Sequence, residues 1–294
     1  MATPTVNILS YNSTGMNNTI KTDWIRNLCK LVKIDFCTIQ EHFKKSKSDK
    51  FFKEHFNDFS SYVIPAFRAE NQDSGRPKGG LAQLIRKNVK IKSERIKTSS
   101  FIIQAQILNF PSTRLLWINT YLPNDPLTII FDDQELTNVL SEIESILDKS
   151  DFDDIIWQGD LNWEMTRLSG FSSRMKQFLE RFGLVSVWEH HPVSYTHIHT
   201  DLVSTTTLDH FVVNERLLSV ITDAGVLHLG DNLSRHSPIM LKLDLGSLPT
   251  QKRIRQSIPR RPAWYKAEQN HRDEFTNAVH EKISSFPIPE YAVQ

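Results

Sequence analysis

The chain has 294 residues, and 35 Lys and Arg against 34 Asp and Glu give it a formal net charge of +1. Hydrophobic residues make up 39% and charged residues 23%, which excludes collagen-like, low-complexity and disordered chains because enough apolar surface exists to fill a core. The length fits one large or two small domains. Two cysteines, Cys29 and Cys37, exclude a disulfide framework and favour a reducing compartment, and we expect neither a signal peptide nor a transmembrane helix.

The first half of the sequence predicts short strands separated by polar loops. A strand at residues 5–11 leads into a polar loop, and a helix follows at residues 21–32 with apolar positions at helical spacing. A short buried strand at residues 35–40 ends in a charged loop. Further strands are expected at residues 61–67, 80–85, 100–109 and 115–121.

The second half alternates helices and strands. An amphipathic helix is expected at residues 132–147, a buried strand at residues 154–158 and a helix at residues 175–182. Late strands are expected at residues 207–213, 226–229 and 238–245. Because strands and helices intermix without an internal repeat, the sequence predicts a mixed α/β layered domain rather than a solenoid or a helix bundle.

The sequence pattern changes after Gly246. Residues 247–262, SLPTQKRIRQSIPRRP, are basic and proline-punctuated, which is typical of a linker. Residues 264–284 recover a helical pattern, with apolar residues at four-residue spacing. We therefore divide the chain into a compact domain at residues 1–246 and a basic linker with a helix at residues 247–294.

Polar and acidic residues recur where the short apolar strands stop. They are Asn12, Glu41, Tyr121, Asn124, Asp160, Asn162, Asp209 and His236. Loops at the carboxyl ends of strands converge on one crevice in layered α/β folds. This oxygen-rich set suits a hard divalent cation, and no cysteine and histidine cluster has the spacing of a zinc site. A metal with one histidine and several amides describes phosphodiester hydrolysis well.

Each of these residues also has an ordinary structural interpretation. Glu41 alone is more often a solvated loop acid, and the Gly-Asp-Leu-Asn sequence at residues 159–162 is more often a tight turn. A lone His236 is more often a surface histidine, and Tyr121 a core aromatic residue. Their order and spacing along the chain together favour a common site.

The order of these motifs resembles the endonuclease/exonuclease/phosphatase superfamily, which contains AP endonucleases, deoxyribonuclease I and LINE-type retrotransposon endonucleases. The similar segments lie between about Val6 and Leu245 and are ILSYN, IQE, GGLAQLI, NTYLPN, WQGDLN, SYTH, TTTLDHFVV and LSRHSPI. GDLN and LDHFVV ahead of a late His-Ser-Pro are jointly specific. The resemblance implies a DNase I-like, four-layer α/β sandwich, in which two mixed β-sheets pack face to face with helices outside.

The resemblance also implies a role for each matched residue. Glu41 and Asn12 would hold Mg²⁺, for which Mn²⁺ is an expected substitute. Asp160 and Asn162 would position and activate the attacking water or stabilise the leaving group. Asp209 would orient His236 at the scissile phosphate, since a carboxylate partner raises the pKa of a histidine and fixes its tautomer. Whether Asp160 or His236 is the general base stays open. Further hydrogen bonds to phosphate would come from Tyr121, Asn124, Thr196 and Ser234.

The chain departs from the family pattern at Arg235. The family usually carries Ser-Asp-His, and this sequence reads Ser234-Arg235-His236. Because arginine cannot ligate a metal but donates readily to phosphate, a second metal position is in doubt. Thr14 also stands where LINE-type sequences often carry asparagine. The hypothesis is that Arg235 contacts a DNA phosphate and that the enzyme needs one tightly bound metal ion.

Three features favour a nucleic acid substrate inside the cell. The expected lack of a signal peptide and of disulfides disfavours secreted nucleases and sphingomyelinases. Basic clusters at residues 44–53 and 86–97 are expected to flank the cleft, with solvated surface charge as the alternative. The tail around RRPAWY at residues 260–265, with its helix, resembles the linker that joins the endonuclease to the reverse transcriptase in LINE-type polyproteins.

These features favour a Mg²⁺-dependent endonuclease domain, residues 1–246, of a non-LTR retrotransposon. Such an enzyme nicks one strand of duplex DNA and leaves a 3′-hydroxyl that primes reverse transcription. Expected partners are double-stranded DNA and the reverse transcriptase region of the same polyprotein, with no membrane, and the expected site of action is the nucleus. Sequence preference is expected to depend on a hairpin near residues 200–207 and on DNA deformability. The alternatives are an apurinic/apyrimidinic-site repair endonuclease of the same fold and a catalytically degenerate nucleic-acid-binding module.

Overall fold

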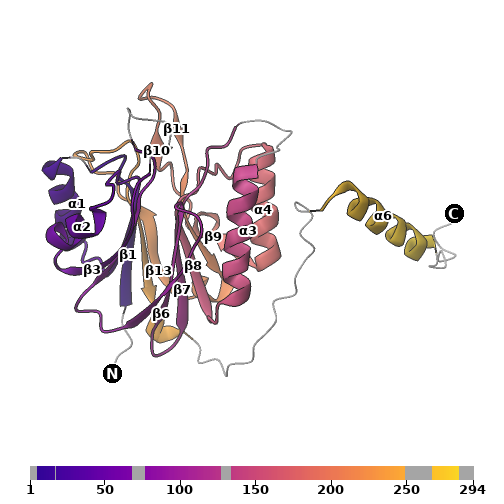
Figure 1. Ribbon diagram of the computed structural model, residues 1–294, viewed down its shortest axis with the longest axis horizontal. Coiled ribbons are helices and arrows are strands. Elements are labelled where there is room, and N and C mark those ends of the chain that lie inside the picture. The colour runs from indigo at the N-terminus through magenta and orange to yellow at the C-terminus, as the bar shows by residue number, and fades with distance from the viewer. Residues whose placement is uncertain (1–4, 17, 68–76, 127–133, 249–266, 285–294) are drawn as a thin grey trace.

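Two six-stranded β-sheets form the middle of the molecule (Figure 1). The computed structural model describes residues 5–16, 18–67, 77–126, 134–248 and 267–284. The first sheet has the order β13-β14-β1-β2-β4-β3, formed by Ile221–Val226, Ile239–Asp244, Thr5–Asn12, Phe36–Gln40, Leu81–Arg86 and Phe59–Ile64. The second has the order β5-β6-β7-β8-β12-β9, formed by Lys92–Ile96, Ile103–Asn109, Arg114–Tyr121, Asp154–Asp160, Asp209–Asn214 and Leu184–Ser186. Both sheets are mixed, because β1 pairs with β2 and β7 with β8 in parallel and the other pairs are antiparallel.

Helices cover the outer faces of the two sheets. Figure 1 shows α1 (Thr19–Leu31) and α2 (Ser48–His55) on one side, and α3 (Gln134–Lys149) and α4 (Gly170–Phe182) on the other. One buried hydrophobic cluster joins each helix pair to its sheet, and a third lies between the sheets. The four-layer, DNase I-like sandwich implied by the motifs is therefore confirmed.

The remaining elements are short or lie outside the sandwich. They are η1 (Val187–Glu189), β10 (His197–Ile198), β11 (Thr205–Thr206), α5 (Glu215–Leu218), η2 (Leu245–Ser247) and α6 (Gln269–Ser284). β10 and β11 pair as a two-stranded hairpin, in the region where a hairpin was expected. Within the described ranges, no helix is long and apolar enough to cross a membrane.

Three expected elements need correction. The strand expected at residues 226–229 is wrong, because β13 ends at Val226 and its bulge between Ile221 and Asp223 disturbs the alternation that marks a strand. α4 begins at Gly170 rather than residue 175, because the Ser169 hydroxyl accepts a hydrogen bond from the Ser172 amide and caps the helix. α2 replaces part of an expected charged loop, since its lysines face solvent while one phenylalanine packs inward.

The linker expected at residues 247–262 lies mostly outside the described residues, which omit residues 249–266. The helix expected at residues 264–284 is observed as α6, which Figure 1 shows apart from the sandwich. The division of the chain at residue 246 stays a prediction.

Buried amides connect the two sheets near one end of the sandwich. The Gln40 side chain, at the end of β2, donates to the Asn119 Oδ1 atom near the end of β7 at 2.7 Å. Gln158 of β8 likewise donates to the Thr38 hydroxyl of β2 at 2.6 Å. All four residues are fully buried, so the bonds form in a low dielectric and hold the strand ends at a fixed separation. The polar residues of the candidate site lie at this end.

Candidate active site

The candidate site lies where the ends of β1, β2, β8 and β12 meet at one rim of the two sheets. In the first sheet, the parallel strands β1 and β2 bring Asn12 opposite Gln40, and Glu41 follows directly. In the second sheet, Asp160 at the end of β8 pairs with Asp209 at the start of β12. Because parallel strands end at the same edge, the sheet topology brings together motifs that are nearly 200 residues apart in the sequence.

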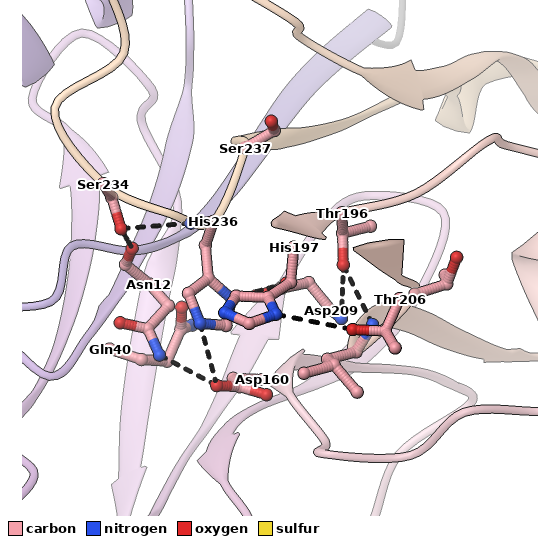
Figure 2. Close-up of polar contacts among 12 residues, drawn as sticks. Asn12, Gln40, Asp160, Thr196, His197, Thr206, Asp209, Ser234, His236 and Ser237 are labelled. Atoms are coloured by element: carbon pink, nitrogen blue, oxygen red, sulfur yellow. Dashed lines mark hydrogen bonds and ion pairs between the residues drawn. The ribbon is translucent and has the colours of Figure 1, made fainter. Parts of the chain in front are cut away.

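Asn12 joins two carboxylates from different sheets. Its Nδ2 atom donates to Glu41 Oε2 at 3.0 Å and to Asp160 Oδ2 at 2.8 Å. Asn12 and Asp160, which lie side by side in Figure 2, are buried, whereas Glu41 is half-buried. The side-chain oxygen of Asn12, Oδ1, accepts a hydrogen bond from the Thr14 backbone amide at 2.9 Å, which fixes the orientation of the Asn12 side-chain amide. Asn12 therefore holds both carboxylates in place.

His236 and Asp209 form a buried ion pair. The His236 Nδ1 atom lies 2.8 Å from Asp209 Oδ2, and the Nε2 atom lies 3.8 Å from Asp160 Oδ2. Burial lowers the pKa of His236, but attraction by Asp209 and Asp160 outweighs it and raises this pKa to about 9. The ring is therefore an imidazolium at neutral pH, with its Nε2 proton directed toward the side of Asp160.

The pKa of Asp160 is shifted as well, in this case toward neutrality and mainly by burial. Burial raises its pKa from 3.8 to about 7, and the negative charge of Asp209 adds to this, while the His236 charge and the Asn12 hydrogen bond oppose it. A carboxyl group that titrates near neutrality can accept a proton from water and release it again. The two groups thus differ in role: Asp160 suits a general base and His236 a charged hydrogen-bond donor.

The backbone around the site is held in rare conformations. Gly159, directly before Asp160, has a φ of +138°, and a Cβ atom there would lie 2.0 Å from the Thr120 carbonyl oxygen. Glu41 and Asn162 have φ values of 51° and 46°, in the left-handed region that non-glycine residues seldom adopt. Such strain persists only where the surrounding structure fixes it, and it concentrates at functional sites.

Three other expected site residues support the backbone of the site. Asn162 donates its backbone amide to Asp160 Oδ1 at 3.0 Å and its side chain to the Leu122 carbonyl at 2.7 Å. The buried Thr196 hydroxyl accepts from the amides of Leu208 and Asp209. The Ser234 hydroxyl contacts the Asn12 carbonyl, the Thr14 hydroxyl and the His236 amide. The phosphate contacts expected for Thr196 and Ser234 stay predictions.

The other expected phosphate-binding residues lie at the surface of the rim. Tyr121 pairs with Asp160 across the parallel strands and is half-buried. Asn124 and Arg235 are exposed, and Arg235 directly precedes His236. These positions leave all three side chains accessible from solvent, and their roles stay predictions.

Sequence reasoning missed two residues that shape the site. Asn232 accepts from the Tyr11 hydroxyl at 2.8 Å and donates to the carbonyls of Ser234 and His236, so it fixes the loop that carries His236. His197 packs its ring against His236, with centroids 4.5 Å apart (Figure 2). His197 is the last residue of the SYTH motif, but its contact with His236 depends on a strand pairing that sequence periodicity does not show.

The donor set fits a hard divalent cation. One ligand atom from each of Asp160, Asp209 and His236 lies within 4.8 Å of the others, and the Asn12 amide links Asp160 to Glu41. His236 Nδ1 is committed to Asp209, which leaves carboxylate oxygens as the main donors. Mg²⁺ is typically held by one or two carboxylates together with water and substrate phosphate. Glu41 and Asp160 fit that role, and ligation by Asn12 stays a prediction.

The first residues of the two basic clusters, Lys44 and Arg86, lie at different ends of the first sheet. Lys44 follows Glu41 closely, and its ammonium lies over the Phe51 ring at 4.1 Å from the centroid. Arg86 instead lies at the opposite end of the first sheet, beside the start of β2, where its guanidinium donates to the Ile34 and Cys29 carbonyls. The expectation that residues 86–97 flank the cleft is therefore wrong for Arg86 and stays a prediction for the rest of that segment.

Comparison with solved structures places the fold. No protein-family model and no curated protein matches the chain. The chain is similar to the AP endonuclease LMAP from Leishmania major, at 17% identity and a TM-score of 0.63, over 81% of this chain and 87% of that one. It is also similar to the endonuclease domain of TRAS1, a telomere-specific non-LTR retrotransposon, at 14% identity and a TM-score of 0.60, over 83% and 100%. A third similar structure is the 3′ phosphatase NExo from Neisseria bound to product DNA hairpin, at 13% identity and a TM-score of 0.60, over 81% and 99%. At these identities the shared property is the fold, which is the fold that the motif resemblance implies.

Proposed function

We propose that this chain is a divalent-metal-dependent DNA endonuclease. The observation that carries the proposal is the joining of two half-sites at one rim: Asn12 holds Glu41 and Asp160, and Asp209 holds His236 beside them. A base, a charged donor and a carboxylate-rich metal position are the groups that phosphodiester hydrolysis requires. The solved structures that share the fold include nucleases and a 3′ phosphatase, which supports the same reaction class.

The geometry suggests how the reaction proceeds. Asp160, with a pKa of about 7, accepts a proton from the attacking water as the new P–O bond forms. The His236 imidazolium donates a hydrogen bond to a phosphate oxygen, where negative charge increases in the transition state. The P–O3′ bond breaks, the leaving O3′ takes a proton from solvent while Asp160 returns its proton to solvent, and the products are a 3′-hydroxyl and a 5′-phosphate. A divalent cation held by Glu41 and Asp160 would neutralise charge on the phosphate.

The finer proposal is that the chain is the endonuclease of a non-LTR retrotransposon. The match to the TRAS1 endonuclease domain covers that whole domain, and the basic, proline-punctuated residues after Gly246 resemble a linker to a reverse transcriptase region. On this proposal the nick supplies a primer end for reverse transcription, and the enzyme acts in the nucleus. The reverse transcriptase region of the same polyprotein is the proposed protein partner.

An AP-site repair endonuclease is the second candidate. The similarity in fold to the Leishmania AP endonuclease, at a TM-score of 0.63, supports this candidate as well as the similarity to TRAS1 supports the first. The two candidates differ in substrate, because a repair enzyme strongly prefers an abasic site, whereas a retrotransposon endonuclease nicks intact duplex at a restricted set of positions.

One assay tests both the reaction and the candidate. Supercoiled plasmid with Mg²⁺ is followed to the nicked circle, and nick positions are mapped on a long duplex with and without one abasic site. We expect nicking of intact DNA that DNA ligase reseals, which reports 3′-hydroxyl and 5′-phosphate ends. Asp160→Ala should abolish it, while Asp58→Asn, an exposed acid at the other end of the first sheet, should not. Nicking that survives in Asp160→Ala would refute the mechanism, and cleavage restricted to the abasic site would select the repair enzyme.

A further inference from the structure

His197 lies directly opposite His236 across a short antiparallel pairing. The residues on either side exchange backbone hydrogen bonds, from the Ile198 amide to the Arg235 carbonyl at 3.0 Å and from the Ser237 amide to the Thr196 carbonyl at 2.7 Å. His197 and His236 are therefore a non-hydrogen-bonded pair, the type in which the two side chains lie closest together. The ring centroids are 4.5 Å apart and the ring planes are tilted by 46°.

The hairpin of β10 and β11 holds His197 in this position. Its Nδ1 atom lies 3.4 Å from the Thr206 hydroxyl, drawn as a dashed line in Figure 2. His199, the residue after β10, places its ring centroid 4.8 Å from that of His197 and its Nε2 atom 3.2 Å from the same hydroxyl. Thr206 of β11 thus contacts both histidines, and the His199 ring packs against the His197 ring.

His236 needs such support because its hydrogen bond to Asp209 fixes only one atom of the ring. The terminal torsion of a histidine is broad, so an imidazole held at Nδ1 alone can rock about that bond. Rocking would move Nε2, the atom that lies 3.8 Å from Asp160. A flat side chain against one face of the ring limits this motion without taking up either nitrogen.

We propose that His197 is a positioning residue for the reaction, which holds the His236 ring so that Nε2 faces the phosphate beside Asp160. The inference rests on the proposed endonuclease function. The role requires a planar side chain at position 197 rather than its nitrogen atoms.

Three variants test this role through kcat and KM for plasmid nicking. His197→Ala should lower kcat about 10- to 100-fold with KM little changed, because misplacement of a catalytic group slows the chemical step more than substrate binding. His197→Phe, which keeps a flat ring, should stay within about 3-fold of wild type. His190→Ala, which changes an exposed histidine outside the hairpin, is the matched control and should behave as wild type.

A spectroscopic readout separates this role from simple loss of folding. In the full chain labelled at histidine carbons, the His236 Cε1–H signal should be a single sharp peak in wild type and in His197→Phe. In His197→Ala it should broaden or split while other histidine signals and the thermal midpoint stay near wild type.

Wild-type kcat in His197→Ala would overturn the proposal, as would a His197→Phe variant as slow as His197→Ala, since that result would assign the role to a nitrogen atom. An unperturbed His236 signal in His197→Ala would overturn it too. Failure of the endonuclease proposal is distinguishable, because it appears as absent nicking in wild type while the His236 signal can still be measured.

Discussion

Replacing Asp209 by asparagine removes the charge that keeps His236 protonated. The His236 pKa is about 9 in the folded protein against an ordinary 6.5, and this difference corresponds to about 3 kcal/mol in favour of the imidazolium. Asp209 is the strongest of the groups that raise this pKa, while burial alone would lower it. In Asp209→Asn the pKa should therefore fall to about 6.5 or below, although the ring keeps its size and its surroundings.

The expected rate effect depends on pH. With a pKa of about 9, about nine-tenths of His236 is imidazolium at pH 8, against about one part in thirty with a pKa of 6.5. The ratio of wild-type to variant kcat/KM should therefore grow about 20-fold between pH 6 and pH 8, in addition to any pH-independent loss from misorientation. In wild type, the rate should fall as His236 loses its proton near pH 9.

The pH dependence of the unfolding free energy independently checks the raised pKa of His236. The folded pKa of His236 lies above the unfolded value, so its contribution is fully present below pH 6.5 and is lost as pH rises through about 9. Asp209→Asn should therefore cost more unfolding free energy at pH 6 than at pH 10, measured by urea denaturation. Plasmid-nicking rates at constant ionic strength complete the test, with Asp58→Asn as the control. A basic limb that stays near pH 9 in Asp209→Asn would refute the reasoning.

Three further predictions follow from the site. Gly159→Ala should destabilise the protein by about 3 kcal/mol or more, because the added Cβ meets the Thr120 carbonyl at 2.0 Å. Gly225→Ala is the control and should cost far less, because the space around Gly225 is open. Equal urea midpoints for the two variants would contradict this prediction. Mg²⁺ should raise the thermal midpoint of wild type but not of Glu41→Gln, and an identical shift in both would remove Glu41 from the metal site. Arg235→Asp should reduce the salt dependence of DNA binding by about one phosphate contact and alter the Mg²⁺ dependence of nicking; if neither changes, Arg235 does not contact the DNA backbone.

The strand-end residues of the site were accessible from the sequence because each closes an apolar run. Asn12 and Asp160 are the last residues of buried strands, and His236 lies three residues before β14. Their convergence depends on which strands are parallel, and in the structure β1 runs parallel to β2 and β7 runs parallel to β8. The two mixed sheets and the helices on their outer faces, which the motif resemblance implied, are confirmed.

What the sequence did not show depends on pairings between segments too short for any periodicity. β10 has two residues, His197 and Ile198, so no alternation marks it as a strand. The hydrogen bonds between side-chain amides of the two sheets, such as that from Gln40 to Asn119, join residues that hydropathy would place on a polar surface. The sequence pattern did not predict β13, because its central residues are exposed and its pairing with β14 contains a bulge.

The charges at the site give a reason for a cation that is independent of any comparison. Glu41, Asp160 and Asp209 bring three carboxylates to one rim, and the His236 imidazolium pairs with two of them. A phosphodiester is itself an anion, so with these carboxylates ionised the site would repel its substrate. Asp160 already responds to this crowding, since burial and Asp209 raise its pKa to about 7. A divalent cation between Glu41 and Asp160 would reverse the local sign, lower the Asp160 pKa and make the same rim attractive to a phosphate backbone.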